Sequence, residues 1–257
     1  MAVDAGAVAL RGAAVTDSRK LSRIEALDGL RGLAALLVVF QHVAEGILKM
    51  HTLPPDFERA GRLLLGETFN FGRFGVALFF LLSGFVIPFS FSTDRPLHRF
   101  VISRVFRLYP AYWLSLGFAL LVLHAIGVRV PAPGVIAANL TMMQKYLGQP
   151  DVVAAYWTLA TELAFYAMAA GLVAGGRLRT PGVLTGSIAA LLATAVLLAL
   201  ASPLVGRRLP ADLPLHLGLM LLGTILRLAM LEGDPIARRL ARRMIVTFLI
   251  VAPVVQF

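Results

Sequence analysis

The chain has 257 residues, of which 58% are hydrophobic and only 15% charged, and its mean hydropathy is +0.81. A soluble domain is usually about half apolar and about a quarter charged, so this composition excludes an ordinary soluble protein and indicates a membrane protein. We therefore assign the net charge of +10 to cytoplasmic loops facing anionic lipid, and we expect no nucleic acid partner. The absence of cysteine excludes disulfides, a thiol nucleophile and cysteine-ligated metal sites.

The predicted elements begin with a polar arm. Residues 1–25 lack a continuous apolar core, so we predict a mobile cytoplasmic arm and not a signal peptide. Apolar runs of about 20 residues then predict six membrane-spanning helices, and hence an all-α, polytopic transmembrane helix bundle. The predicted spans are 27–46, 71–91, 108–127, 155–174, 182–201 and 213–231.

A seventh span begins near Met244, and its apolar run reaches the end of the chain after 14 residues. A single crossing needs about 20 residues, so we expect a transmembrane domain over residues 26–257 that is incomplete at its C-terminus. A cytoplasmic N-terminus places 16 of the 24 Lys and Arg residues on the cytoplasmic side. This bias agrees with the positive-inside rule, and we expect a multi-pass protein of the inner (plasma) membrane.

The first span carries four ionisable groups that hydrocarbon disfavours. Arg31 and His42 are eleven residues apart, which places them roughly 20° apart around a helix and about 16 Å apart along it. Asp28 and Glu45 lie within roughly 60° of the same line, so the spacing predicts one buried polar stripe. Such groups usually line a cavity, a substrate path or a proton relay. An interfacial anchor at Arg31 and a helix-packing hydrogen bond at His42 are the alternatives.

The next two polar segments each allow two interpretations. In "FFLLSGFVI", Ser83 and Gly84 suit close packing of helices, which explains most of the pattern. In "RVFRLYPAYW", Arg104 and Arg107 lie on one side of a helix, where two guanidinium groups suit a phosphate-rich ligand. Anchoring at the cytoplasmic boundary is the alternative for the two arginines, and the residues alone favour it.

The fourth span, containing "WTLATELAFY", brings Glu162 to a depth similar to that of His42. A carboxylate beside a neutral imidazole orients it and raises its basicity, which is typical of a general base. His42 and Glu45 also have the spacing of a metal-ligand pair, but the sequence holds no matching second pair. We therefore expect no metal site.

Together, "LDGLRGLAALLVVFQH", "FFLLSGFVI", "RVFRLYPAYW" and "WTLATELAFY" resemble, in this order, the acyltransferase-3 family of integral-membrane O-acyltransferases. The resemblance covers roughly residues 24–170. It implies transfer of an acyl group, by default acetyl, from cytoplasmic acyl-CoA to a hydroxyl of an extracytoplasmic glycan, glycolipid or related acceptor. It also implies a bacterial cell-envelope enzyme whose acyl-CoA is a donor substrate, with no permanently bound cofactor.

The resemblance further implies roles for individual residues. His42 matches the family's essential histidine, Arg31 its paired arginine and Glu162 its acidic residue, and we treat these three as catalytic. Expected donor-binding residues are Arg104, Arg107, Ser83 and Gly84, and expected substrate-binding residues are Asp28, Trp157 and Tyr166.

Two other classes of function remain open. A proton-coupled transporter would use the same intramembrane His, Arg and Glu as a relay. A non-catalytic fragment that assembles with a partner is the second alternative.

Overall fold

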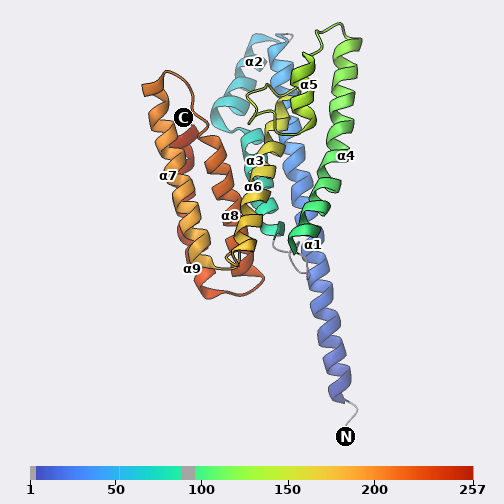
Figure 1. The fold of residues 1–257 in the computed structure, drawn as a ribbon, viewed down its shortest axis with the longest axis vertical. Coiled ribbons are helices and arrows are strands. Elements are labelled where there is room, and N and C mark those ends of the chain that lie inside the picture. The colour runs from blue at the N-terminus through green and yellow to red at the C-terminus, as the bar shows by residue number, and fades with distance from the viewer. Residues whose placement is uncertain (1–3, 52, 88–95, 257) are drawn as a thin grey trace. The chain divides into compact units, whose positions relative to one another are not determined.

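The structure, a computed structural model, describes residues 4–51, 53–87 and 96–256, and within these ranges it contains helices and turns but no strand. The all-α prediction is therefore confirmed. The elements, in the order shown in Figure 1, are α1 (Asp4–Lys49), α2 (Pro55–Arg62), η1 (Leu63–Thr68), α3 (Phe71–Val86), α4 (Pro96–Ala125), α5 (Pro133–Leu140), η3 (Ala154–Tyr156), α6 (Trp157–Ala174), α7 (Pro181–Val205), α8 (Asp212–Met230) and α9 (Pro235–Gln256).

Five helices of the described residues are long and apolar enough to cross a membrane, which confirms a polytopic bundle. They are Ala26–Lys49, Leu97–Ala125, Ala154–Ala174, Pro181–Val205 and Asp212–Met230.

The helices differ from the predicted spans at three places. The span predicted at 71–91 corresponds to the 16-residue helix α3, and residues 88–91 lie outside the described part of the chain. Helix α4 begins at Pro96 instead of 108, so the arginine-containing segment before the apolar run is already helical. Helix α9 begins at Pro235, before Met244, because the arginine-rich stretch ahead of the apolar run continues the same helix.

The arm predicted for residues 1–25 is helical from Asp4 onward and continues into the first span without a break. Its sequence contains six Ala and three Arg residues, both of which are strong helix formers. The first span and the segment before it therefore form one 46-residue helix.

The chain divides into two compact units, Met1–Leu82 and Ser83–Phe257. In the first unit, close packing joins α1 to the start of α3. A Cβ atom added at Gly75 would lie 2.6 Å from the carbonyl oxygen of Ala34. Only glycine permits this close approach of two helices.

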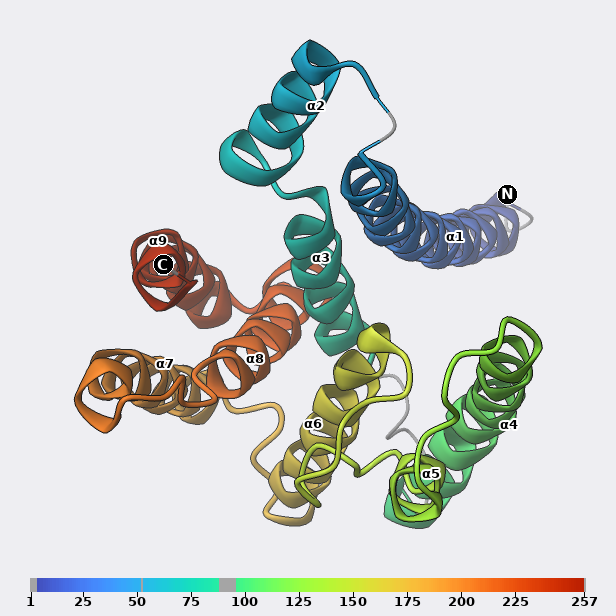
Figure 2. The same ribbon diagram turned by 90° about the horizontal axis from the view of Figure 1, so that it is seen from above.

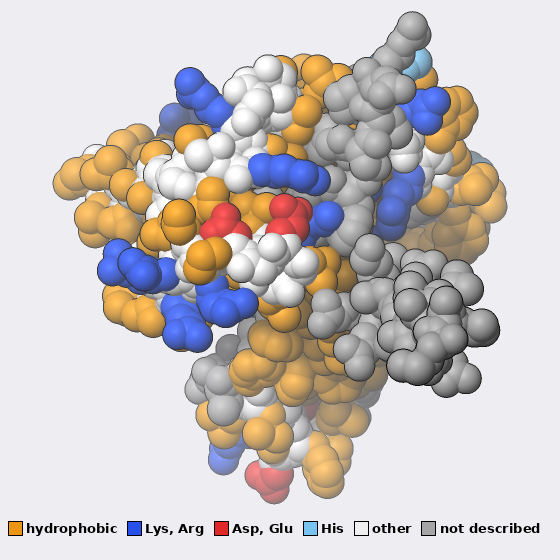
Figure 3. Space-filling view, turned by 90° about the horizontal axis from the view of Figure 1, so that it is seen from below, with side chains coloured by type: hydrophobic (Ala, Val, Ile, Leu, Met, Phe, Trp, Pro, Cys, Tyr) orange, Lys and Arg blue, Asp and Glu red, His pale blue; other side chains and the backbone are white. Residues whose placement is uncertain are grey.

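In the second unit, α7, α8 and α9 lie side by side (Figure 1, Figure 2). Helix α8 provides the core, and its Leu221 and Ile225 are fully buried. Helices α6 to α9 alternate in direction. The α6–α7 and α8–α9 connections consequently lie at one end of this unit, and Lys and Arg side chains are prominent on the face seen from that end (Figure 3).

The connection between α5 and α6 is held by one buried amide. The Nδ2 of Asn139 donates to the carbonyl oxygens of Val135 at 2.8 Å and Pro150 at 2.9 Å, and its Oδ1 accepts from the Val152 N–H at 3.1 Å. The Tyr112 hydroxyl of α4 donates to the Asn139 carbonyl at 2.7 Å. These bonds fix the loop that leads into the first turn of α6.

Candidate active site

Helix α1 carries the polar residues predicted for the first span. Arg31 is partly buried, and its guanidinium lies 5.2 Å from the centroid of the Phe79 ring in α3. Asp28 and His42 are exposed. Arg31 and His42 therefore share one unbroken helix, as predicted, but only the arginine packs against a neighbouring helix of its unit.

Gln41, which the sequence interpretation missed, is the buried polar residue of this part of α1. It is 1% exposed. Its Nε2 donates to Glu45 Oε1 at 2.7 Å and to the Leu65 carbonyl at 2.9 Å, and its Oε1 accepts from the Phe71 N–H at 3.2 Å. In the sequence, Gln41 stands out only as an amide within an apolar span. Its two backbone partners lie more than 20 residues away, so the local sequence does not indicate them. Gln41 thus ties α1 to η1 and α3 and fixes the helix that carries His42.

Replacing Gln41 with leucine is expected to destabilise the protein by about 2 kcal/mol, because the Leu65 carbonyl and the Phe71 N–H would lose a buried partner. Thermal unfolding in an uncharged detergent measures the effect. The matched control is Gln149→Leu, which changes an exposed amide and should leave the midpoint unchanged. Equal midpoints for Gln41→Leu and wild type would show that these bonds contribute nothing.

The second unit brings three predicted site residues together. The Tyr166 hydroxyl donates to the buried Glu162 carboxylate one turn earlier in α6. The Arg104 guanidinium of α4 lies 5.1 Å from the centroid of the Tyr166 ring and 5.3 Å from that of Phe100. Arg104 is only 7% exposed. Tyr166 therefore contacts both Arg104 of α4 and Glu162 of its own helix, and its hydroxyl orients the Glu162 carboxylate.

The other predicted donor-binding residues differ in exposure. Arg107 is exposed on α4, one turn beyond Arg104, so its guanidinium is available to a ligand. Ser83 is buried. Gly84 packs directly against α8, where a Cβ would lie 1.8 Å from the Met220 carbonyl oxygen. The Thr224 hydroxyl donates to the Gly84 carbonyl at 3.0 Å, so within the second unit this pair joins the segment that begins at Ser83 to α8.

Trp157 lies at the first residue of α6 beside two groups that the sequence did not associate with it. The His216 ring of α8 has its centroid 5.3 Å from that of Trp157. The Lys145 Nζ lies 5.6 Å from the Trp157 centroid. Indole faces attract cations and stack on flat apolar surfaces. The cluster of Trp157, His216 and Lys145 at the N-terminal end of α6 is therefore a candidate substrate contact.

His42 belongs to the first unit and Glu162 to the second, so their pairing stays a prediction. Within the residues that the structure describes, no three His, Asp or Glu side chains gather as metal ligands. What the two units offer chemically is an exposed imidazole, two arginines near aromatic rings and one buried, oriented carboxylate.

Comparison with known proteins identifies the family to which the chain belongs. Residues 24–253 match the acyltransferase domain of the acyltransferase-3 family, so the match reaches beyond the segment 24–170 on which the resemblance rests. The chain is also 29% identical over 155 residues to acyltransferase MdmB of Streptomyces mycarofaciens. This alignment covers 57% of the chain and 38% of that protein. No solved structure matches the chain.

Proposed function

Because the chain belongs to the acyltransferase-3 family, we propose that it moves an acyl group, by default acetyl, from acyl-CoA to a hydroxyl of an extracytoplasmic glycan or related acceptor. The donor enters from the cytoplasmic side and the acceptor from the other side of the membrane. The bond that forms is an ester, the bond that breaks is the thioester, and CoA leaves with a free thiol.

The observation that carries this proposal is the unbroken helix α1 with Arg31 and His42 eleven residues apart. The two residues are separated by about 16 Å along the helix. An extended donor whose phosphates stay near the cytoplasmic boundary can therefore pass Arg31 and present its thioester near His42. His42 takes the proton of the acceptor hydroxyl, the oxygen attacks the thioester carbonyl, and the proton passes to the departing thiolate.

The remaining residues bind or orient the reacting groups. Arg107, exposed on α4, is placed to meet phosphates of the donor. Arg104 stacks on Tyr166, whose hydroxyl bonds to Glu162, so Arg104 is proposed to hold the carboxylate that orients the His42 imidazole. Trp157, at the start of α6, is proposed to contact the acceptor.

The direct test follows release of CoA with a thiol reagent in membranes that contain the chain. The protein has no cysteine, so it contributes no thiol signal of its own. We expect CoA release above that of control membranes only when an acceptor glycan is added, with the acyl group recovered on the glycan. A transporter would release no CoA, and an unchanged CoA signal across a panel of hydroxyl-bearing glycans would contradict the proposal.

A further inference from the structure

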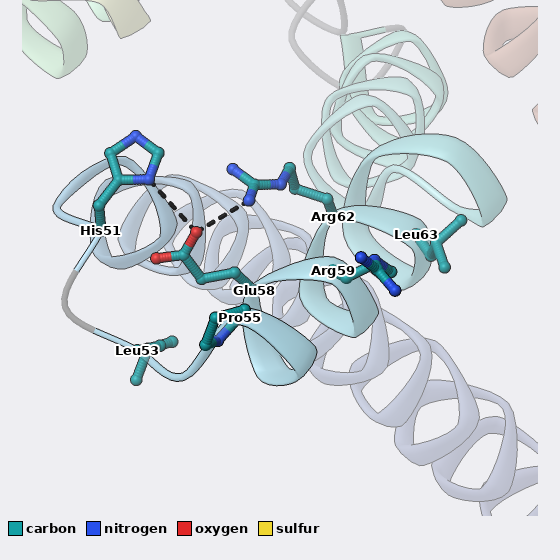
Figure 4. A pocket seen from close by; sticks show the side chains of 7 residues that line it. All are labelled: His51, Leu53, Pro55, Glu58, Arg59, Arg62 and Leu63. Carbon is teal, nitrogen blue, oxygen red and sulfur yellow. Dashed lines mark hydrogen bonds and ion pairs between the residues drawn. The ribbon is translucent and has the colours of Figure 1, made fainter.

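A second feature of the first unit lies outside the residues proposed for catalysis. Directly after α1, the chain turns at His51, whose φ is 51°, and enters α2. His51, Leu53 and the polar side of α2 line an open hollow of about 560 Å³ (Figure 4). The side chains that line it include His51, Leu53, Glu58, Arg59, Arg62 and Leu63.

The hollow has a positive balance of charge. Glu58 Oε2 accepts from Arg62 Nη2 at 2.8 Å and contacts His51 Nδ1 at 3.2 Å (Figure 4). Burial raises the pKa of the Glu58 carboxyl, but the hydrogen bonds of His51 and Arg62 outweigh it and hold the pKa below its usual value. Glu58 therefore stays ionised and neutralises one cation. Arg59 has no partner among the residues that the structure describes, so no carboxylate of this part of the chain neutralises its positive charge.

The two arginines are arranged to act together. Arg59 and Arg62 are three residues apart, so their guanidinium groups lie on one side of α2. A guanidinium has five N–H donors in a planar fork, and Arg62 uses one of them on Glu58. The fork geometry matches the oxygens of a phosphate.

Away from the two arginines, α2 and the following element η1 each carry a large exposed apolar side chain. Phe57 of α2 is 70% exposed and Leu64 of η1 is 62% exposed. The adjoining turn adds Met50, also 70% exposed. A short segment with arginines on one side and exposed Phe and Leu side chains on the other has the character of an interfacial segment, whose apolar side chains enter the acyl region while its cations lie at headgroup level.

We propose that the hollow binds the phosphate of a membrane lipid headgroup, with Arg59 and Arg62 as its ligands and Phe57 and Leu64 among the acyl chains. The charge complementarity requires an anion, and the exposed apolar side chains place that anion at a lipid surface. Binding would hold α2 against the bilayer directly after the helix that carries His42. This property does not depend on the catalytic assignment.

The test uses the full chain in an uncharged detergent with a phosphatidylglycerol that carries a photo-crosslinking group on its acyl chain. After illumination, digestion with pepsin, which does not need arginine for cleavage, identifies the labelled segments. We expect saturable labelling of the segment 50–64. Arg59→Gln should lower the apparent affinity there about tenfold, the loss expected for one charge-assisted contact, while labelling of other segments stays unchanged.

Three comparisons decide the outcome. Arg129→Gln alters another exposed arginine and should leave the labelling of 50–64 unchanged. A diacylglycerol with the same photo-group but no phosphate should label this segment weakly, and inorganic phosphate at the concentration of the lipid should not compete. Unchanged affinity in Arg59→Gln, equal labelling by the diacylglycerol, or full competition by inorganic phosphate would each overturn the proposal.

Discussion

Replacing His42 with alanine is expected to lower acyl transfer by about 10²–10⁴-fold, the contribution of a positioned general base. Without the imidazole, the acceptor hydroxyl would have to lose its proton to water. Because His42 is exposed and makes no hydrogen bond within the described part of the chain, its loss should leave the unfolding midpoint unchanged. Activity and stability should therefore separate clearly in this variant.

The initial rate of CoA release, with the amount of inserted protein matched, measures the effect. His124→Ala is the matched control, since His124 is an exposed histidine near the end of α4, and it should keep the wild-type rate. A His42→Ala protein with a near-normal rate would show that another group removes the proton.

The second large effect is expected at Gly84, where substitution by alanine should destabilise the protein by about 3 kcal/mol or more. The added Cβ would lie 1.8 Å from the Met220 carbonyl oxygen and 2.5 Å from its carbon. Both are backbone atoms, so no side chain can rotate away and the backbone at Gly84 must move away from α8. Separation would also break the bond from the Thr224 hydroxyl to the Gly84 carbonyl.

Thermal unfolding of purified protein distinguishes this effect from a general effect of adding a methyl group. Gly117→Ala is the matched control, because Gly117 lies inside α4 with nothing within 4 Å of an added Cβ. Its midpoint should stay the same or rise slightly, since alanine favours helix. If Gly84→Ala unfolded at the wild-type temperature and only weakened binding of acyl-CoA, Gly84 would be a donor-binding residue and not a packing residue.

The membrane helices were predictable because a crossing needs a continuous apolar run of a certain length, which is a property of the local sequence. The close contacts at Gly75 and Gly84 were predictable for a similar reason, since glycine in an apolar helix marks an approach of two backbones. The start of α9 was not predictable from the sequence, because its first turns are rich in arginine and resemble a polar loop. The short helix α2 likewise gives no spanning signal inside its polar connection.

The site was only partly predictable because its contacts depend on the tertiary fold. Spacing placed Arg31 and His42 on one helix, and the structure confirms that helix. Nothing in the local sequence shows that Arg104 would pack on Tyr166, since 61 intervening residues separate them. The same is true of Gln41, whose partners come from η1 and α3. Buried polar residues are fixed by partners that only folding brings near.

The sidedness of transfer tests the central claim most directly. Acyl-CoA does not cross membranes, so inverted vesicles, which expose the cytoplasmic side, can be given labelled acyl-CoA outside with the acceptor glycan sealed inside. We predict labelled glycan in the lumen of these vesicles and none in right-side-out vesicles treated alike. Label on glycan only in right-side-out vesicles, or in neither preparation with the protein fully inserted, would contradict transfer from a cytoplasmic donor to an extracytoplasmic acceptor.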